Sequence, residues 1–278
     1  MSASAPRLDR ISPEPPALRG LLREYRASAG LFATLVRRTI LVRYSQTAIG
    51  IAWASLQPLA LMLVFSLFFG MLVRMPSDGI PYPLFFCTGL WVWQFAAQAV
   101  SQGSAAVLAN SHIVGKVYFP RALLPAAAVA VALIDLLAAA PALLAVMLAC
   151  GAVPDPLGLL VFALTLLASV ALLLGLALWL AALQVLFRDT AYLVPFALQV
   201  WMFASPVIYP ASLVPEGWRL LYALNPMVAM VDAARFAFAG GPAPGAATLL
   251  PAFLVSLAGL GAGHRFFRRR QGQFADAV

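Results

Sequence analysis

Charge is scarce in this chain of 278 residues. Asp, Glu, Lys and Arg together make up 10% of it, whereas 63% of the residues are hydrophobic. Soluble domains carry about a quarter charged residues, so this composition excludes an ordinary soluble domain. The hydrophobic residues gather in long runs, and these predict an all-α integral membrane protein. We expect six transmembrane helices, at residues 51–73, 84–108, 123–149, 157–183, 191–208 and 246–267.

The chain also has little of the chemistry that enzymes and metal sites require. It contains two histidines and two cysteines, and its sequence shows no zinc-type ligand cluster, carboxylate pair or Ser/His arrangement. A phosphate-binding loop is absent as well, because Gly115-Lys116 is followed by Val117 instead of Ser or Thr. We therefore predict no catalytic residue, no metal site and no cofactor in this chain. Active transport would take its energy from a separate subunit or from a gradient.

The two cysteines, Cys87 and Cys150, both fall near the outer ends of predicted spans. A disulfide between them is conceivable at that depth. Isolated cysteines beside a bilayer more often serve as small apolar residues, and we interpret both in this way.

Positive charge is distributed unevenly across the predicted spans. If the loops alternate from a cytoplasmic N-terminus, 15 of the 18 basic residues face the cytoplasm, and Arg74, Arg219 and Arg235 remain outside. This bias predicts that both termini are cytoplasmic and that the number of spans is even. Topology and anionic lipid head groups then explain the basic excess without a nucleic-acid ligand. We expect two cytoplasmic tails, 1–27 and 268–278, of which the first has a disordered composition and no signal peptide.

Residues 28–50 precede the first span and show helical periodicity. Leu31, Leu35 and Val36 fall on one face, while Arg37 and Arg38 make the segment amphipathic. Such a helix should lie in the cytoplasmic interface and not cross the membrane. Two interpretations remain open: a membrane anchor, or an elbow helix that carries motion from a cytoplasmic partner to the spans.

Three glutamines, Gln94, Gln98 and Gln102, recur every four residues in the second span. A stripe of polar amides facing lipid would be costly, so it must face other helices or a wet cavity. Hydrogen bonding between helices and the lining of a pore are equally consistent with this stripe.

Asp135 lies midway along the third span, where an unpaired carboxylate would cost about 3 kcal/mol. It must therefore face the protein interior and find a hydrogen-bond donor, or stay protonated. Because the sequence places no second acid within a span, and His264 falls only at the cytoplasmic end of the last one, a proton relay is disfavoured, and we favour a packing role.

Residues 209–241 are too apolar for an ordinary external loop and too interrupted by proline to cross the membrane. Pro215-Glu216 and Asn225-Pro226 each indicate a helix start. The two helices, near 216–224 and 226–238, are too short to span a bilayer. We expect a re-entrant pair, surrounded by protein or water, that forms an outer gate. The expected gate residues are Trp218, Tyr222, Asn225 and Pro226.

Four segments of the sequence indicate a particular protein family, which composition and apolar length do not. They are RYSQTAIGIAWASLQPL (43–59), NSHIVGKVYFPRALLP (110–125), LFRDTAYLVPFALQVWMFASPVIYP (186–210) and VPEGWRLLYALNPMVAMVDAARFAFAGG (214–241). Together they resemble the permease subunits of ABC transporters that export polysaccharides. The resemblance runs from about residue 30 to the C-terminus, with a consistent order of motifs. It covers the O-antigen, capsule and teichoic acid exporters, and among these we favour O-antigen.

The resemblance implies a homodimer of this permease with two ATPase subunits, which bind ATP and Mg²⁺, in the bacterial inner membrane. Twelve spans would enclose one channel at the two-fold axis for a lipid-linked polysaccharide. The loop at 110–121 would be a coupling helix in a groove of the ATPase; the alternative is a plain connection that Lys116 and Arg121 stabilise at lipid phosphates. The expected contacts are Ser111, His112, Ile113, Val114, Gly115, Lys116 and Tyr118.

A lipid-linked glycan is too polar for hydrocarbon and too long for a pocket that opens alternately to each side. A continuous channel suits it, because sugar CH faces stack on aromatic rings and hydroxyls bind amides. We expect the lipid pyrophosphate to be drawn to inner-face arginines, Arg37, Arg38 and Arg43. The candidate channel residues are Trp53, Gln57, Gln94, Gln98, Gln102, Tyr192, Gln199 and Trp201.

Three other functions remain open. A related permease could export a small hydrophobic compound, in which case an apolar pocket should replace the polar channel. A membrane-embedded lipid-modifying enzyme would need clustered acids, histidines or metal ligands at one interface. A gradient-driven carrier would need coupled intramembrane charges beyond Asp135, or an inverted repeat.

Overall fold

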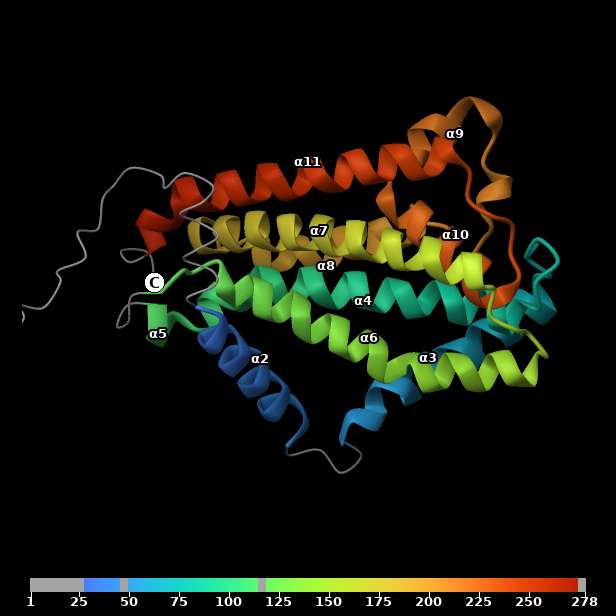
Figure 1. Ribbon diagram of the computed structural model, residues 1–278, viewed down its shortest axis with the longest axis horizontal. Coiled ribbons are helices and arrows are strands. Elements are labelled where there is room, and N and C mark those ends of the chain that lie inside the picture. The colour runs from blue at the N-terminus through green and yellow to red at the C-terminus, as the bar shows by residue number, and fades with distance from the viewer. Residues whose placement is uncertain (1–27, 46–49, 115–118, 275–278) are drawn as a thin grey trace, which may run out of the picture.

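The computed structural model describes residues 28–45, 50–114 and 119–274, and every regular element in this part of the chain is helical (Figure 1). The all-α prediction is confirmed for these residues. The long helices run side by side along the molecule. They are α4 (Tyr82–Ala109), α6 (Leu123–Ala149), α7 (Pro156–Leu186) and α11 (Ala246–Arg270).

Five stretches of the described chain are long and apolar enough to cross a membrane. They are Ser55–Leu72, Tyr82–Ala109, Leu123–Ala149, Pro156–Leu186 and Ala246–Gln273. The sixth predicted span, 191–208, is not confirmed. Its helix α8 (Thr190–Phe203) has 14 residues, which reach only about 21 Å, and it ends well before residue 208.

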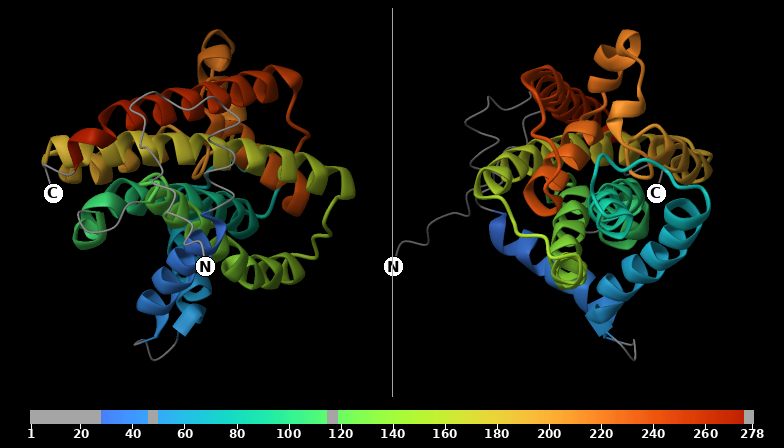
Figure 2. Two further views of the ribbon diagram at one scale, coloured as in Figure 1. Left: turned by 60° about the vertical axis from the view of Figure 1, so that its left-hand side comes forward. Right: turned by 90° about the vertical axis from the view of Figure 1, so that its right-hand side faces the viewer.

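The first span is not a single regular helix. A short 3₁₀ turn, η1 (Gly50–Ala52), leads into α3 (Trp53–Phe65), and a π-helical segment, η2 (Ser66–Leu72), follows. The preceding helix α2 (Ala29–Tyr44) occupies the predicted interfacial segment. α2 and α3 lie on the same flank of the bundle, where α2 packs against α6, and α3 against α4 and α6 (Figures 1 and 2).

Local capping determines several helix ends. Asp155 accepts a hydrogen bond from the amide of Gly158 and begins α7, with Pro156 in the first turn. Asn225 accepts one from the amide of Met227 at 3.1 Å and begins α10 (Pro226–Ala239). The predicted start at Pro215-Glu216 is also confirmed, because α9 covers Glu216–Ala223. The remaining short elements are α5 (Ser111–Val114), η3 (Ala211–Leu213) and η4 (Gln271–Gln273).

Small residues let the central helices approach closely. α7 packs against both α4 and α11. A methyl group on Gly175 or on Gly263 would collide with the backbone of the facing helix, and one on Gly103 would collide with Ala177. Close backbone approach of this kind is how helices gain packing energy in lipid, where the hydrophobic effect does not drive them together.

Several short elements and turns lie at the two ends of the bundle. α5 and the C-terminal end of α11 lie at one end, which we call the α5 end (Figure 1). α9, the turn between η2 and α4, and the turn between α10 and α11 lie at the other, which we call the α9 end. α10 enters the bundle from there and is largely buried against α4, α7 and α11.

Candidate functional site

The intramembrane acid Asp135 has a cationic partner. Its side chain projects from α6, is 4% exposed, and forms an ion pair with Arg43 near the C-terminal end of α2. A buried carboxylate is tolerated in a bilayer when it is paired and hydrogen-bonded. The prediction that Asp135 faces the interior and finds a donor is therefore confirmed.

Arg43 also binds the glutamine stripe of α4. Its Nη1 donates to Oε1 of Gln98 at 3.3 Å, and its Nη2 donates to Oε1 of Gln102. One guanidinium thus joins the end of α2 to both α4 and α6. The planar fork of arginine suits this arrangement, because its donors point to separate acceptors at once.

Tyr44 completes the cluster from the neighbouring position. Its hydroxyl donates to Oδ1 of Asp135 at 2.7 Å. Burial raises the pKa of the Tyr44 phenol, and the hydrogen bond and negative charge of Asp135 raise it further, whereas Arg43 acts in the opposite direction. The phenol therefore stays protonated at neutral pH and remains a donor. We call Arg43, Tyr44, Gln98, Gln102 and Asp135 the elbow cluster.

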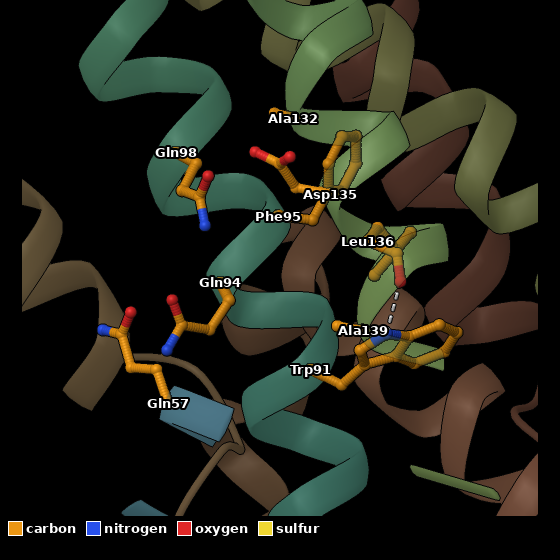
Figure 3. Close-up of a pocket in the computed structure, with 9 residues that line it drawn as sticks. All are labelled: Gln57, Trp91, Gln94, Phe95, Gln98, Ala132, Asp135, Leu136 and Ala139. Atoms are coloured by element: carbon orange, nitrogen blue, oxygen red, sulfur yellow. Dashed lines mark hydrogen bonds between the residues drawn. The ribbon is translucent and has the colours of Figure 1, made fainter. Parts of the chain in front are cut away.

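A small pocket adjoins the elbow cluster. It measures about 30 Å³, which is room for water but not for a sugar. Gln94 and Gln98 face it from α4, Asp135 faces it from α6, and Gln57 reaches toward Gln94 (Figure 3). Trp91 closes one side and donates its indole N–H to the carbonyl of Leu136 at 2.8 Å.

The predicted channel residues lie in several separate places. The amides of Gln57, Gln94 and Gln98 share the pocket, with Gln102 next along the stripe. Tyr192 and Gln199 instead lie seven residues apart on an exposed face of α8, and Tyr192 is 83% exposed. Trp53 is exposed at the start of α3.

Trp201 lies apart from all of these residues, at the α9 end. It packs edge-on against Trp93 with ring centroids 5.6 Å apart, and its indole N–H donates to Oδ1 of Asn225 at 2.9 Å. Asn225 Nδ2 donates to the carbonyl of Ala204 at 3.1 Å and to the hydroxyl of Ser205 at 3.0 Å. One asparagine therefore caps α10 and holds the end of α8.

The four residues expected at the outer gate lie together. Trp218, Tyr222, Asn225 and Pro226 line a mostly apolar groove of about 500 Å³, which Trp201 also lines. Tyr222 donates to the hydroxyl of Tyr209 at 3.2 Å, and Tyr209 donates to the carbonyl of Phe203 at 2.9 Å. The groove thus joins α8, α9 and the start of α10.

Arg37 and Arg38 do not share the surroundings of Arg43. Both are exposed on α2, whereas the guanidinium of Arg43 is held by the elbow cluster. The three arginines expected at a pyrophosphate therefore divide into two exposed cations and one that already has an anionic partner.

The predicted coupling loop begins as the short helix α5. Ser111 and Ile113 are half-buried, and His112 is exposed. Gly115, Lys116 and Tyr118 lie outside the described residues. Arg121, which the alternative interpretation assigned to lipid phosphates, donates to the carbonyl of Gln271 and lies 6.0 Å from the ring centroid of Phe274. It ties this loop to the C-terminal end of α11.

The described residues show no candidate metal site. No group of three or more His, Cys, Asp or Glu side chains gathers there to hold a metal ion. Cys87 and Cys150 are both free in the structure.

Sequence reasoning missed the partnership between Arg43 and Asp135. Each was noted for a different role, Arg43 for pyrophosphate binding and Asp135 for packing. The missing signal was charge balance, because a lone acid in a span requires a cation and Arg43 is the last arginine before the first span. Nothing in the sequence indicated a role for Tyr44 beyond its position next to Arg43.

Comparison with known proteins agrees with this picture of a helical membrane protein. The family model described as ABC-2 type transporter matches residues 30–239. The chain is 32% identical over 261 residues to the O-antigen export system permease protein RfbA of Myxococcus xanthus, covering 93% of this chain and 99% of that protein. Two proteins of the same description from Klebsiella pneumoniae are each 24% identical over 211 residues, covering 76% of this chain and 81% of each relative. The chain therefore belongs to the ABC-2 type transporter family of membrane proteins.

Proposed function

We propose that this chain is the permease subunit of an ABC exporter that moves a lipid-linked polysaccharide, O-antigen in particular, to the outer face of the inner membrane. The observation that carries the proposal is the similarity to the Myxococcus xanthus permease, because it covers almost the whole of both chains. Alignment over that length includes the elbow segment, the membrane helices and the α9 end.

The character of the polar side chains supports a glycan cargo. The glutamine stripe along the second span, Gln94, Gln98 and Gln102, consists of uncharged amides. Amides exchange hydrogen bonds with sugar hydroxyls without binding them as tightly as a charge would. Tyr192 and Gln199 on the exposed face of α8 add an aromatic ring and an amide on one helix face.

The channel itself requires a second copy of the chain. Within one protomer the pocket beside the stripe holds only about 30 Å³, too little for a sugar. The exposed residues of α8, α3 and η2 supply large apolar surface that a second copy would cover, including Phe196, Val200, Leu63 and Leu67. We propose a homodimer in which these faces border the conduit.

We further propose six spans with both termini in the cytoplasm. α8 and the turn that follows it would form the fifth crossing, and α9 and α10 would enter the outer leaflet and return. The deep burial of α10 supports this, since backbone that enters a membrane without crossing it must be surrounded by protein. The basic last turn of α11, Arg268 to Arg270, supports a cytoplasmic C-terminus.

ATP and Mg²⁺ would be bound by a separate ATPase subunit, two copies per homodimer. Conformational change of the ATPase would be transmitted to the permease through α5 and through α2. The contacts at α5 and in the loop after it would be Ser111, His112, Ile113, Val114, Gly115, Lys116 and Tyr118. The elbow cluster would pass this change to α4 and α6, and the outer gate would open at the groove of Trp218, Tyr222, Asn225 and Pro226. Arg37 and Arg38 remain available to bind a lipid pyrophosphate. Arg43 lies deeper in the interface, where the elbow cluster holds its guanidinium.

Reconstitution tests the proposal directly. The permease and the ATPase that co-purifies with it are reconstituted into vesicles in the inside-out orientation, so that their cytoplasmic face is outside. Lipid-linked glycan is supplied in the outer leaflet of these vesicles. We expect ATP-dependent disappearance of the glycan from the accessible face, measured by lectin binding. Transport of a small hydrophobic dye with no movement of glycan would favour the alternative exporter and would overturn this proposal.

A further inference from the structure

A second polar pocket lies at the α9 end, away from the elbow cluster. It measures about 200 Å³ and lies between the turn that precedes α4, the short η3, α10 and the turn that leads into α11. Its polar side chains come from four separate segments. They are Asp78, Ser212, Asp232, Arg235 and Thr248.

Arg235 is the unusual member of this pocket. It is 4% exposed, and its guanidinium carbon lies 3.4 Å from the ring centroid of Phe85. Its Nη2 donates to the carbonyl of Val207 at 3.1 Å, and this is the one hydrogen bond that the described residues give the guanidinium. Its Nε is buried without a partner. A buried guanidinium normally uses most of its five donors, so this one is under-satisfied.

The acids of the pocket do not pair with Arg235. Among the described residues, no carboxylate oxygen lies within ion-pair distance of its guanidinium, although Asp232 is one helical turn away and Asp78 lines the same pocket. Asp78 is held in place by the hydroxyl of Ser212, which donates to it at 2.8 Å. The pocket is therefore lined by a cationic donor and two carboxylate acceptors that are not joined in ion pairs.

This combination restricts the chemistry of an occupant. A phosphate would meet two carboxylates against one guanidinium, and an ammonium group has no acceptor for Arg235. A divalent cation prefers several oxygen ligands and would be repelled by the buried guanidinium. A sugar residue fits all of these groups, because each hydroxyl donates to one neighbour and accepts from another.

We propose that this pocket binds one residue of a neutral glycan, whose hydroxyls donate to Asp78 and Asp232 and accept from Arg235. The proposal rests on the proposed export of a polysaccharide and names a contact for it at the α9 end. Binding of a single residue is weak, so the site would hold the chain briefly and release it.

Ligand-observed saturation-transfer NMR on the full-length permease in nanodiscs tests the site. The probes are the methyl glycosides of glucose, galactose and mannose, with glycerophosphoethanolamine as a head-group probe. We expect transfer to at least one glycoside with a dissociation constant in the millimolar range. Asp232→Asn should weaken it at least tenfold, because the amide accepts more weakly and adds donors where the sugar donates. Ser212→Ala, which frees Asp78, should weaken it several-fold.

Asp189→Asn is the matched control, since Asp189 is an exposed acid at the start of α8 and outside the pocket. Absence of transfer from every glycoside, or equal binding by wild type and Asp232→Asn, would show that the pocket holds only water. Binding of glycerophosphoethanolamine in preference to the glycosides would reassign it to a lipid head group. The vesicle assay is run on the same sample: glycan transport without glycoside binding overturns this inference alone, whereas failure of wild-type transport overturns the proposed function.

Discussion

The guanidinium of Arg43 meets the carboxylate of Asp135 across 92 positions of sequence, at the junction of α2 with α6. The same guanidinium bonds Gln98 and Gln102 on α4, so a change in the tilt of α2 must either move these helices or break the cluster. This physical connection is the basis for assigning α2 a role in transmitting motion. A simple membrane anchor has no need of it.

Separating the pair should be costly. We expect Arg43→Ala and Asp135→Ala each to destabilise the permease by about 2 kcal/mol, because each leaves a desolvated charge without its partner. The double variant Arg43→Met with Asp135→Leu should recover most of the stability, since it removes both charges and keeps the volume. Thermal unfolding in nanodiscs measures this, and a double variant that loses as much as the two single variants summed would contradict the pairing.

The same pair predicts a separation of stability from transport. In the Arg43→Met and Asp135→Leu double variant, the fold should persist while the link between α2 and the spans is lost. We expect glycan transport to fall at least tenfold although ATP hydrolysis by the assembled complex continues. A double variant that transports at the wild-type rate would assign the elbow cluster a purely structural role.

Close packing of α7 and α11 gives a prediction with an internal control. Gly263→Ala places a methyl group against the backbone at Gly175, so we expect a loss of about 2 kcal/mol. Gly261→Ala, two residues earlier on the same helix, meets no atom and should be neutral or stabilising by up to about 1 kcal/mol through helix propensity. Equal melting temperatures for the two variants would argue against this helix contact.

The side chain of Asn225 acts both as a hydrogen-bond acceptor and as a donor, and two different substitutions separate these roles. Asn225→Ala removes the cap of α10 and the acceptor of Trp201, and we expect a cost of about 2 kcal/mol. Asn225→Asp keeps both acceptors but loses the donors to Ala204 and Ser205, so its loss should be smaller. Hydrogen exchange at the first amides of α10 reports the cap. Faster exchange in Asn225→Asp than in Asn225→Ala would contradict this division.

The coupling role of α5 predicts an effect on transport without one on folding. His112 is exposed, so His112→Ala should leave the melting temperature unchanged and reduce ATP-driven transport several-fold by weakening contact with the ATPase. Asp189→Ala, an exposed residue in the loop before α8, serves as the comparison. A normal transport rate for His112→Ala, with the ATPase still bound, would count against the proposed contact.

Much of the helical framework could be predicted from the sequence, because helix ends depend on neighbouring residues. Asn225-Pro226 begins α10 as predicted, and Asp155-Pro156 begins α7 in the same way, through caps that reach only two or three residues ahead. Apolar length likewise identified the long spans. It leaves the span at 191–208 unconfirmed, because α8 stops at Phe203 and the side chain of Asn225, about 20 residues later, holds the turn at Ala204 and Ser205.

The sequence by itself determined that the chain is a helical membrane protein without nucleotide chemistry in its motifs, since composition, apolar length and local caps need no knowledge of packing. Only the tertiary structure decided that Asp135 is neutralised by Arg43, that Asn225 joins α8 to α10, and that Arg235 faces a pocket with two acids and no ion-pair partner among the described residues. These relationships depend on which faces of distant helices meet. The energy that selects those faces comes from close packing and from the cost of leaving polar groups unpaired in a bilayer, both of which depend on the assembled bundle.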